Sequence, residues 1–199
     1  AYPDHAATIV RSQEYLDFAI DGAVRMQNLI QDLLAYSRIE SNNNEFKMAD
    51  FNTIFEKVTK SLEIRIQEND ALVEFPIVSH SISCDEIQIY QIFLNLVGNS
   101  LKFRSKERKS IIKTTHISDS EYFYFTVEDN GIGFDMKFKD RVFQIFQRLN
   151  TREEYTGTGI GLAICKRIAE RHGGSISAES QVGIGTRITF SIAKRKKEL

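Results

Sequence analysis

Hydrophobic residues recur every three or four positions from about residue 15 to residue 39. They form a broad stripe made of Leu16, Ala19, Ile20, Ala23, Met26, Ile30, Leu33 and Leu34. This period predicts a long amphipathic helix, and the width of the stripe is typical of a helical bundle. No helix of matching pattern precedes it, since the first eleven residues are few and include Pro3. The stripe from Leu16 to Leu34 therefore needs a partner: a second copy, sequence outside this chain, or the following domain.

Beyond the polar run at 41–44, shorter helical and alternating patterns follow in mixed order. Helices are predicted at about 51–68, 85–103 and 160–171, and strands at 46–48, 72–75, 79–83, 111–117, 122–127, 175–178 and 187–192. No regular alternation of strand and helix occurs. The sequence therefore predicts an α+β fold, a two-layer α/β sandwich in which three helices cover one face of a mixed, mainly antiparallel sheet.

The helix predicted at 85–103 combines an apolar face with a polar one. Its core face is expected to hold Ile87, Tyr90, Leu94, Val97 and Leu101. Asn95, Asn99 and Lys102 are spaced by four and three, so they project within an arc of roughly 60°. Two amides and a cation on one face can serve a ligand that carries phosphates and a metal.

Two glycine-rich stretches lie at the ends of predicted elements. Residues 129–134 (Asp-Asn-Gly-Ile-Gly-Phe) follow a strand, and residues 157–162 (Gly-Thr-Gly-Ile-Gly-Leu) open a helix. Glycine pairs at such places indicate sharp turns or close approach of a ligand. Neither stretch begins a βαβ unit, and no Gly-Lys-Ser/Thr sequence occurs, so Rossmann and Walker-type sites are excluded.

Composition narrows the class of protein without naming it. The 199 residues are 42% hydrophobic and 27% charged, with a net charge of −1, which predicts no attraction to nucleic acid or to an anionic membrane. No apolar run spans a bilayer and no signal peptide opens the chain, so we expect a cytoplasmic protein, whose parent can still be membrane-anchored. Cys84 and Cys165 lie far apart, which predicts buried, reduced thiols and no metal site.

Four motifs in order resemble the catalytic domain of sensor histidine kinases. They are Asn95-Leu-Val-Gly-Asn99-Ser-Leu-Lys102-Phe103, Asp129-x-Gly131-x-Gly133, Phe143-x-x-Phe146-x-Arg148-Leu149 and Gly157-x-Gly159-x-Gly161-Leu162. That domain has a Bergerat-type ATP-binding fold and belongs to the GHKL ATPase superfamily, which includes type II topoisomerases and heat-shock chaperones. Residues 11–40 resemble the second helix of the dimerisation hairpin of phytochrome-like kinases. The resemblance thus implies a hairpin remnant at 1–41 and a catalytic ATP-binding domain at 42–199.

The resemblance also implies roles for individual residues. Asp129 would accept a hydrogen bond from the adenine amine, Asn99 would hold magnesium, and Lys102 and Arg148 would neutralise phosphate charge. Gly157 and the other glycines of its stretch would let the backbone approach the phosphates. Nucleotide contacts are implied for Asn95, Asn99, Lys102, Phe103, Asp129, Gly131, Gly133, Phe134, Phe146, Arg148, Thr158, Gly159, Ile160, Gly161, Leu162 and Thr186.

Asn95 favours a kinase over a hydrolase. Hydrolytic relatives carry a glutamate there as general base, and an amide cannot take that role. Asn95, Asn99, Lys102 and Arg148 are therefore predicted to support transfer of the γ-phosphoryl of ATP to a histidine. The alternatives are an ATP hydrolase of the same superfamily and a non-catalytic module that binds ATP or a partner.

The chain departs from the family at the phosphoacceptor. His5 lacks the surrounding acceptor motif, and His172 is predicted to cap a helix end beside Gly173-Gly174. We therefore expect this fragment not to phosphorylate itself. The partners implied are the phosphoacceptor helix of the same or another protomer, the receiver domain of a response regulator, and a second copy through the Leu16 to Leu34 stripe.

Overall fold

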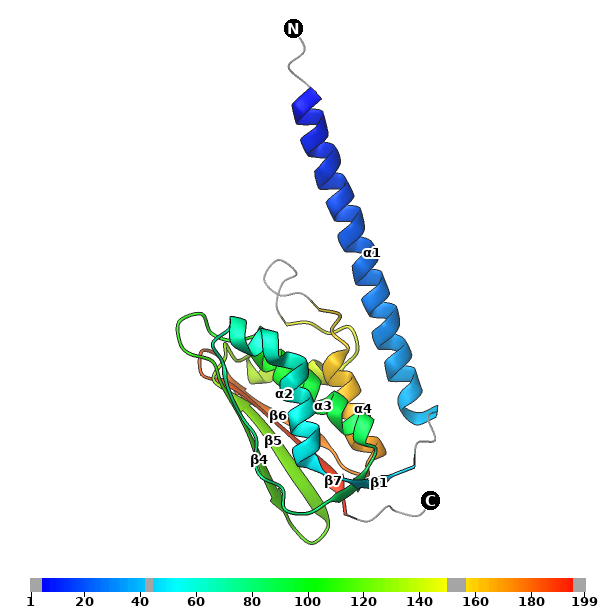
Figure 1. Ribbon diagram of the computed structural model, residues 1–199, viewed down its shortest axis with the longest axis vertical. Helices are drawn as coiled ribbons and strands as arrows, with labels where there is room; N and C mark the ends of the chain where they lie inside the picture. The colour runs from blue at the N-terminus through cyan, green and yellow to red at the C-terminus, as the bar shows by residue number, and fades with distance from the viewer. Residues whose placement is uncertain (1–4, 42–44, 150–156, 195–199) are drawn as a thin grey trace.

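The computed structural model describes residues 5–41, 45–149 and 157–194. Its helices are α1 (His5–Ser41), α2 (Phe51–Glu68), α3 (Glu86–Lys102) and α4 (Gly161–Arg171), with short 3-10 turns η1 (Met136–Phe138) and η2 (Arg141–Phe143). Its strands are β1 (Lys47–Ala49), β2 (Leu72–Glu74), β3 (Ile82–Cys84), β4 (Ile111–Ser118), β5 (Tyr122–Asp129), β6 (Ile176–Gln181) and β7 (Gly185–Ala193). Figure 1 shows α1 extending well beyond the sandwich formed by the other elements.

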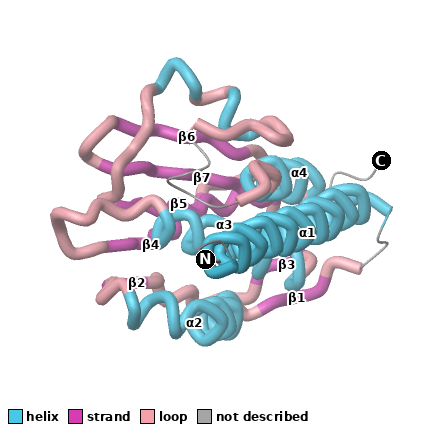
Figure 2. Tube along the Cα trace, turned by 90° about the horizontal axis from the view of Figure 1, so that it is seen from above, coloured by secondary structure: helices cyan, strands magenta, loops and turns pink. Residues whose placement is uncertain are grey.

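Five strands form the main sheet in the order β2-β4-β5-β7-β6, and β1 pairs with β3 in a separate ribbon. Only the β2–β4 pair is parallel in the main sheet. Helices α2, α3 and α4 lie side by side on one face of the sheet (Figure 2). The predicted sandwich of three helices on a mixed, mainly antiparallel sheet is therefore confirmed.

Aromatic residues join the two layers of the core. Phe51 begins α2 directly after the cap Asp50, whose Oδ1 accepts the Asn52 N–H at 2.9 Å. The Phe51 ring stacks on Phe125 of β5 at 4.6 Å between centroids, and Phe93 of α3 meets Phe125 edge to face at 5.6 Å. Such paired rings bury much apolar area and fix the position of α3 over the sheet.

The predicted core face of α3 was right only in part: Val97 and Leu101 are buried, and Tyr90 and Leu94 are partly buried against the core. Ile87 is 71% exposed, and the buried side chains centre on Ile89, Ile92, Phe93 and Leu96. This helix is apolar on most of its circumference, so several stripes fit the period equally well. The sheet and α4 pack against these buried side chains. In this orientation of α3, Asn95 lines the cavity described below.

Helix α1 begins about ten residues earlier than predicted, at His5. No proline or glycine separates Pro3 from Gly22, so nothing in that stretch ends a helix. The C-terminal part of α1 docks on α4: Ile39 is buried, Tyr36 lies 6.0 Å from the Arg167 guanidinium, and Leu29 packs against the core. Much of the stripe from Leu16 to Leu34 stays exposed.

The short strands show smaller shifts from the predicted boundaries. β1 covers Lys47–Ala49 and β3 covers Ile82–Cys84, because pairing with each other is what defines both strands. Most of the polar run at 41–44 lies outside the described residues. Cys84 and Cys165 are both buried free thiols, as predicted, and burial raises the pKa of each to about 12.

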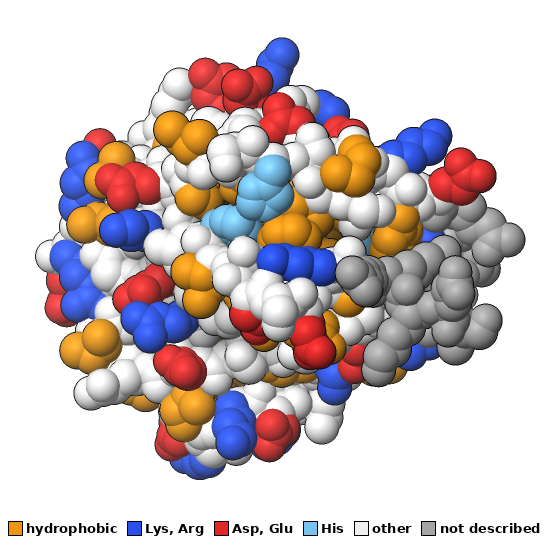
Figure 3. Space-filling model, turned by 90° about the horizontal axis from the view of Figure 1, so that it is seen from below, with side chains coloured by type: hydrophobic (Ala, Val, Ile, Leu, Met, Phe, Trp, Pro, Cys, Tyr) orange, Lys and Arg blue, Asp and Glu red, His pale blue; other side chains and the backbone are white. Residues whose placement is uncertain are grey.

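A histidine and phenylalanine cluster lies at the end of the sandwich seen from below, where Figure 3 shows histidine side chains beside hydrophobic ones. The His80 ring is 5.7 Å from His116 and 5.2 Å from Phe123. Burial, with the nearby His80 and Lys194, lowers the pKa of His116, whose Nε2 is buried without a hydrogen-bond partner. His80, His116 and Phe123 thus form a group of packed rings at this end of the sandwich.

Candidate functional site

A cavity of about 290 Å³ opens between α3, the first glycine stretch, the segment 147–149 and the second glycine stretch. Its lining is Asp32, Asn95, Leu96, Asn99, Ser100, Lys102, Phe103, Asp129, Ile132, Gly133, Phe134, Val142, Gln147, Arg148, Leu149, Gly157, Thr158, Gly159, Gly161, Leu162, Thr186 and Ile188. The four sequence motifs thus meet around one space, as predicted from their order.

Asp129 ends β5 at the wall of this cavity, paired in register with Thr186 of β7. Its Oδ1 accepts the N–H groups of Gly131 at 2.9 Å and of Thr186 at 3.3 Å, and its Oδ2 accepts the Ser100 hydroxyl at 2.8 Å. Burial raises the pKa of Asp129 above its ordinary value, and these three hydrogen bonds act in the opposite direction. The carboxylate is therefore fixed in orientation and still has acceptor capacity toward the cavity.

The first glycine stretch is held by backbone contacts that leave no room for side chains. Gly133 has a φ of 62°, and a Cβ there would lie 2.0 Å from the Gln181 carbonyl oxygen. A Cβ on Gly131 would lie 2.4 Å from the carbonyl oxygen of Phe103. These positions require glycine, because a left-handed backbone and close approach both exclude a side chain.

Arg108 fastens this stretch to the β6–β7 turn. Its guanidinium donates to four backbone carbonyls, those of Asn130, Gly131, Gly183 and Ile184, at 2.7 to 2.9 Å. Sequence reasoning missed this residue, since a lone arginine in a loop carries no pattern. Its rigid fork of donors suits such convergent acceptors.

The three polar residues of α3 reach the cavity together, as their spacing predicted. The Asn95 side-chain amide donates to the Gly161 carbonyl at 3.4 Å, joining α3 to the start of α4. Lys102 lies with its Nζ 4.4 Å from the centre of the Phe103 ring. Burial, followed by the charges of Arg148 and Arg65, lowers the pKa of Lys102. This concentration of positive charge suits an anionic ligand.

The second glycine stretch, residues 157–162, also lines the cavity. Gly157 has a φ of 144°, and a Cβ there would lie 2.7 Å from the Lys102 Nζ. The Thr158 hydroxyl donates to Asp32 Oδ2 of α1 at 2.5 Å. Helix α4 begins at Gly161, so its first N–H groups lie beside the cavity and favour negative charge there.

Three predicted contact residues do not line the cavity. Ile160 is fully buried in the core beneath it, and Phe146 is 54% exposed with a left-handed φ of 63°. Gly131 lies behind Asp129, to which it donates its N–H. Conversely, Ser100 and Asp32 line the cavity without having been predicted, because side-chain roles between distant elements leave no periodic signal.

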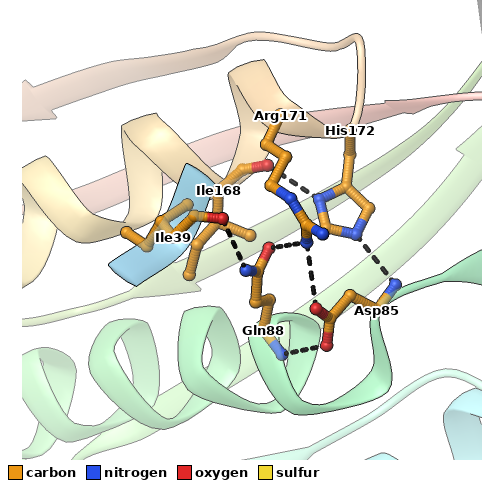
Figure 4. A network of polar contacts seen from close by, with 6 residues as sticks. All are labelled: Ile39, Asp85, Gln88, Ile168, Arg171 and His172. Carbon is orange, nitrogen blue, oxygen red and sulfur yellow. Dashed lines mark hydrogen bonds and ion pairs between the residues drawn. The ribbon is translucent and has the colours of Figure 1, made fainter. Parts of the chain in front are cut away.

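His172 is a structural residue, as predicted. It forms hydrogen bonds at the end of α4 and at the start of α3. Its Nδ1 hydrogen-bonds with the Ile168 carbonyl at 2.8 Å, and its Nε2 accepts the Asp85 N–H at 3.1 Å (Figure 4). Burial lowers the pKa of His172 to about 4, so the ring is neutral at physiological pH. The side chain of His5 lies outside the described residues.

An adjoining ion pair completes this network and reaches α1. Arg171 donates to Asp85 at 2.9 Å and to Gln88 at 2.7 Å, and Gln88 in turn donates to the Ile39 carbonyl at 3.2 Å (Figure 4). The network therefore ties the end of α1 to both α3 and α4.

The donors at the cavity fit a magnesium ion that is bound mainly by a ligand's phosphates. The described ranges contain no group of three or more His, Cys, Asp and Glu side chains that could hold a metal by itself. Asn99, whose side-chain amide offers an oxygen ligand, lines the cavity together with Asn95 and Lys102. Asn99 would hold a hard cation that needs few ligands from the protein and takes the rest from a bound ligand.

Sequence comparison places the chain in a family. Residues 84–196 match the family described as histidine kinase-, DNA gyrase B- and HSP90-like ATPase. The chain belongs to this family. The predicted resemblance to the histidine kinase catalytic domain is thereby confirmed, and the span includes most of the cavity lining.

Individual relatives agree with this assignment. Phytochrome-like protein Cph1 of Synechocystis sp. is 40% identical over 91% of this chain and 24% of its own length, and the circadian input-output histidine kinase CikA of Synechococcus elongatus is 31% identical over 93% and 25%. The chain thus spans about a quarter of the length of these curated relatives.

Solved structures share the fold. The catalytic domain of histidine kinase ThkA is 25% identical with a TM-score of 0.65, covering 76% of this chain and 99% of that domain. Full-length ShkA in complex with AMPPNP is 24% identical with a TM-score of 0.70, covering 94% of this chain and 40% of ShkA. No described helix combines the length and the hydropathy that crossing a membrane requires.

Proposed function

We propose that the chain binds magnesium-ATP and passes the γ-phosphoryl group to a histidine outside this sequence, as part of a sensor histidine kinase. The observation that carries this proposal is the fixed carboxylate of Asp129. It lines a cavity that Lys102 and Arg148 also line. A fixed acceptor and two cations around one cavity match the needs of an adenine base and a triphosphate.

Each wall of the cavity has a task in this proposal. Asp129 accepts a hydrogen bond from the adenine amine, while Ile132 and Ile188 supply apolar contact with the ring. Lys102, Arg148 and the amino end of α4 stabilise phosphate charge. Asn99 would hold magnesium, which draws charge from the phosphates when bound.

Asn95 favours phosphoryl transfer to a protein acceptor over hydrolysis. Its amide donates to Gly161 and cannot take a proton from water. The site then orients ATP and excludes rapid attack by water until an acceptor imidazole arrives. The acceptor belongs to the helix of the same protomer or of another, and a receiver domain takes the phosphoryl group next.

Residues 1–41 are assigned in this proposal to the dimerisation and phosphotransfer hairpin, and residues 42–199 to the catalytic domain. The exposed part of the Leu16 to Leu34 stripe gives a second copy an apolar surface. A cytoplasmic location follows from the supply of ATP. The parent protein can carry its sensor, and any membrane anchor, outside these residues.

Ligand-dependent thermal unfolding tests ATP binding. Magnesium-ATP at 100 times its dissociation constant should raise stability by about 2.7 kcal/mol, and EDTA should remove most of the shift. GTP should give a smaller shift, since it presents a carbonyl in place of the adenine amine. No shift with magnesium-ATP would leave only a partner-binding module.

Two assays separate a kinase from the other readings. Steady-state phosphate release should be slow, and fast release would make the chain a hydrolase. Incubation with γ-labelled ATP should leave no acid-labile label on the isolated fragment. Label mapped to His5 would contradict the external acceptor.

A further inference from the structure

Ser100 occupies a position on α3 from which it acts on Asp129. It follows Asn99 directly, is only 5% exposed, and lines the cavity. Its hydroxyl donates to Asp129 Oδ2 at 2.8 Å. A buried hydroxyl beside a buried carboxylate forms a charge-assisted hydrogen bond, which is stronger than a neutral one.

The two oxygens of Asp129 are held differently. Oδ1 accepts two backbone N–H groups, from Gly131 and Thr186, which are set by the fold and by no side chain. Within the described residues, Ser100 is the only donor to Oδ2. Since each carboxylate oxygen offers about two acceptor sites, one site on Oδ2 remains for a ligand.

We propose that Ser100 is a positioning residue that orients Asp129 Oδ2 toward the 6-amino group of a bound purine and thereby sets the preference for adenine. This inference rests on the proposed ATP site. Without the hydroxyl, Oδ2 loses the one donor that the described part of the chain gives it, in a buried setting. The carboxylate then turns about the two bonds on Oδ1, and its contact with the amine weakens.

The test compares two nucleotides on Ser100→Ala and on the wild type by calorimetric titration with magnesium. One is ATP, and the other is purine riboside triphosphate, which carries hydrogen in place of the 6-amino group. For Ser100→Ala we expect the dissociation constant for ATP to rise about tenfold, while that for the purine analogue stays within twofold. A general loss of structure would weaken both nucleotides alike.

Ser191→Ala is the matched control. Ser191 of β7 is also buried, at 4% exposure, and its hydroxyl oxygen accepts the Ser175 N–H at 2.9 Å, away from the cavity lining. Ser191→Ala removes a buried hydroxyl that makes no hydrogen bond to Asp129. We expect it to change neither dissociation constant, whatever it does to thermal stability.

The outcomes separate this inference from the function on which it rests. An equal loss for both nucleotides in Ser100→Ala, or no loss for either, overturns the role of Ser100 while the ATP site stands. A wild type that binds ATP no better than the purine analogue overturns the reading of Asp129, and Ser100 with it. A wild type that binds neither nucleotide overturns the proposed function as a whole.

Discussion

His172 should make the stability of this protein depend on pH in a way that one substitution removes. The ring is buried at the junction of α3 and α4, where Nδ1 bonds to the Ile168 carbonyl and Nε2 accepts the Asp85 N–H. A second proton on the ring would break the bond from Asp85 and place charge in the core. The folded state therefore holds the neutral ring, and the pKa of His172 falls from 6.5 to about 4.

The size and sign of the effect follow from linkage. Above pH 6.5 the ring is neutral in both states and costs nothing. As the pH falls below 6.5, the unfolded chain binds a proton that the folded chain does not, so the free energy of unfolding decreases. With about 1.36 kcal/mol per pKa unit, the loss from this group between pH 7.5 and pH 4.5 is roughly 2.5 kcal/mol.

Urea unfolding of the wild type and of His172→Gln at both pH values measures this loss. Glutamine does not titrate, so the stability difference between the two proteins should shrink by about 2.5 kcal/mol from pH 7.5 to pH 4.5. Other groups titrate equally in both proteins and cancel. A difference that stays constant, or an NMR titration in which the His172 ring protonates near pH 6.5 in the folded protein, would refute the reasoning.

Two further predictions concern charged side chains, one in the buried network at α4 and one on the cavity lining. Arg171→Met should lower the free energy of unfolding by about 3–5 kcal/mol in urea titrations, because Asp85, whose side chain is 2% exposed, loses its cation. The exposed ion pair of Lys57 and Glu86 is the control. Lys57→Met should lower the free energy of unfolding by less than about 1 kcal/mol. An equal cost for both would contradict the burial argument. Asp32→Asn should tighten ATP binding by roughly 0.5–1 kcal/mol at low salt, with a gain that fades as salt is added, because it removes negative charge from the cavity lining. Weaker binding would show that Asp32 assists the ligand.

The sequence predicted those parts of the fold that have a single hydrophobic period or a clear signal that ends a helix or strand. Helix α2 was predicted at its observed bounds, and it has a single apolar stripe on which Phe51, Ile54, Phe55, Val58 and Leu62 are buried. Helix α3 is apolar on most sides, so its period left the phase open, and the predicted face joined the exposed Ile87 to the buried Val97 and Leu101. Which stripe is buried depends on the sheet and on α4, which lie far away in sequence.

Some residues of the candidate site could be predicted from the sequence and others could not. Asp129, Asn99 and Lys102 stand in ordered motifs, and the structure places all three on the cavity wall. Ser100 and Asp32 were missed because their partners are 29 and 126 positions away in the chain. Ile160 was misplaced because a motif gives position along the chain, while the side chain of the residue before α4 turns into the core.

The central claim is that Asp129 reads adenine in a magnesium-ATP site. Calorimetric titration of magnesium-ATP into the wild type and into Asp129→Asn tests it most directly, since the amide puts a donor where the adenine amine needs an acceptor. We expect one site per chain in the wild type and a loss of about 1–3 kcal/mol of binding free energy in Asp129→Asn. Equal affinity in the two proteins, or no binding to the wild type, would contradict it.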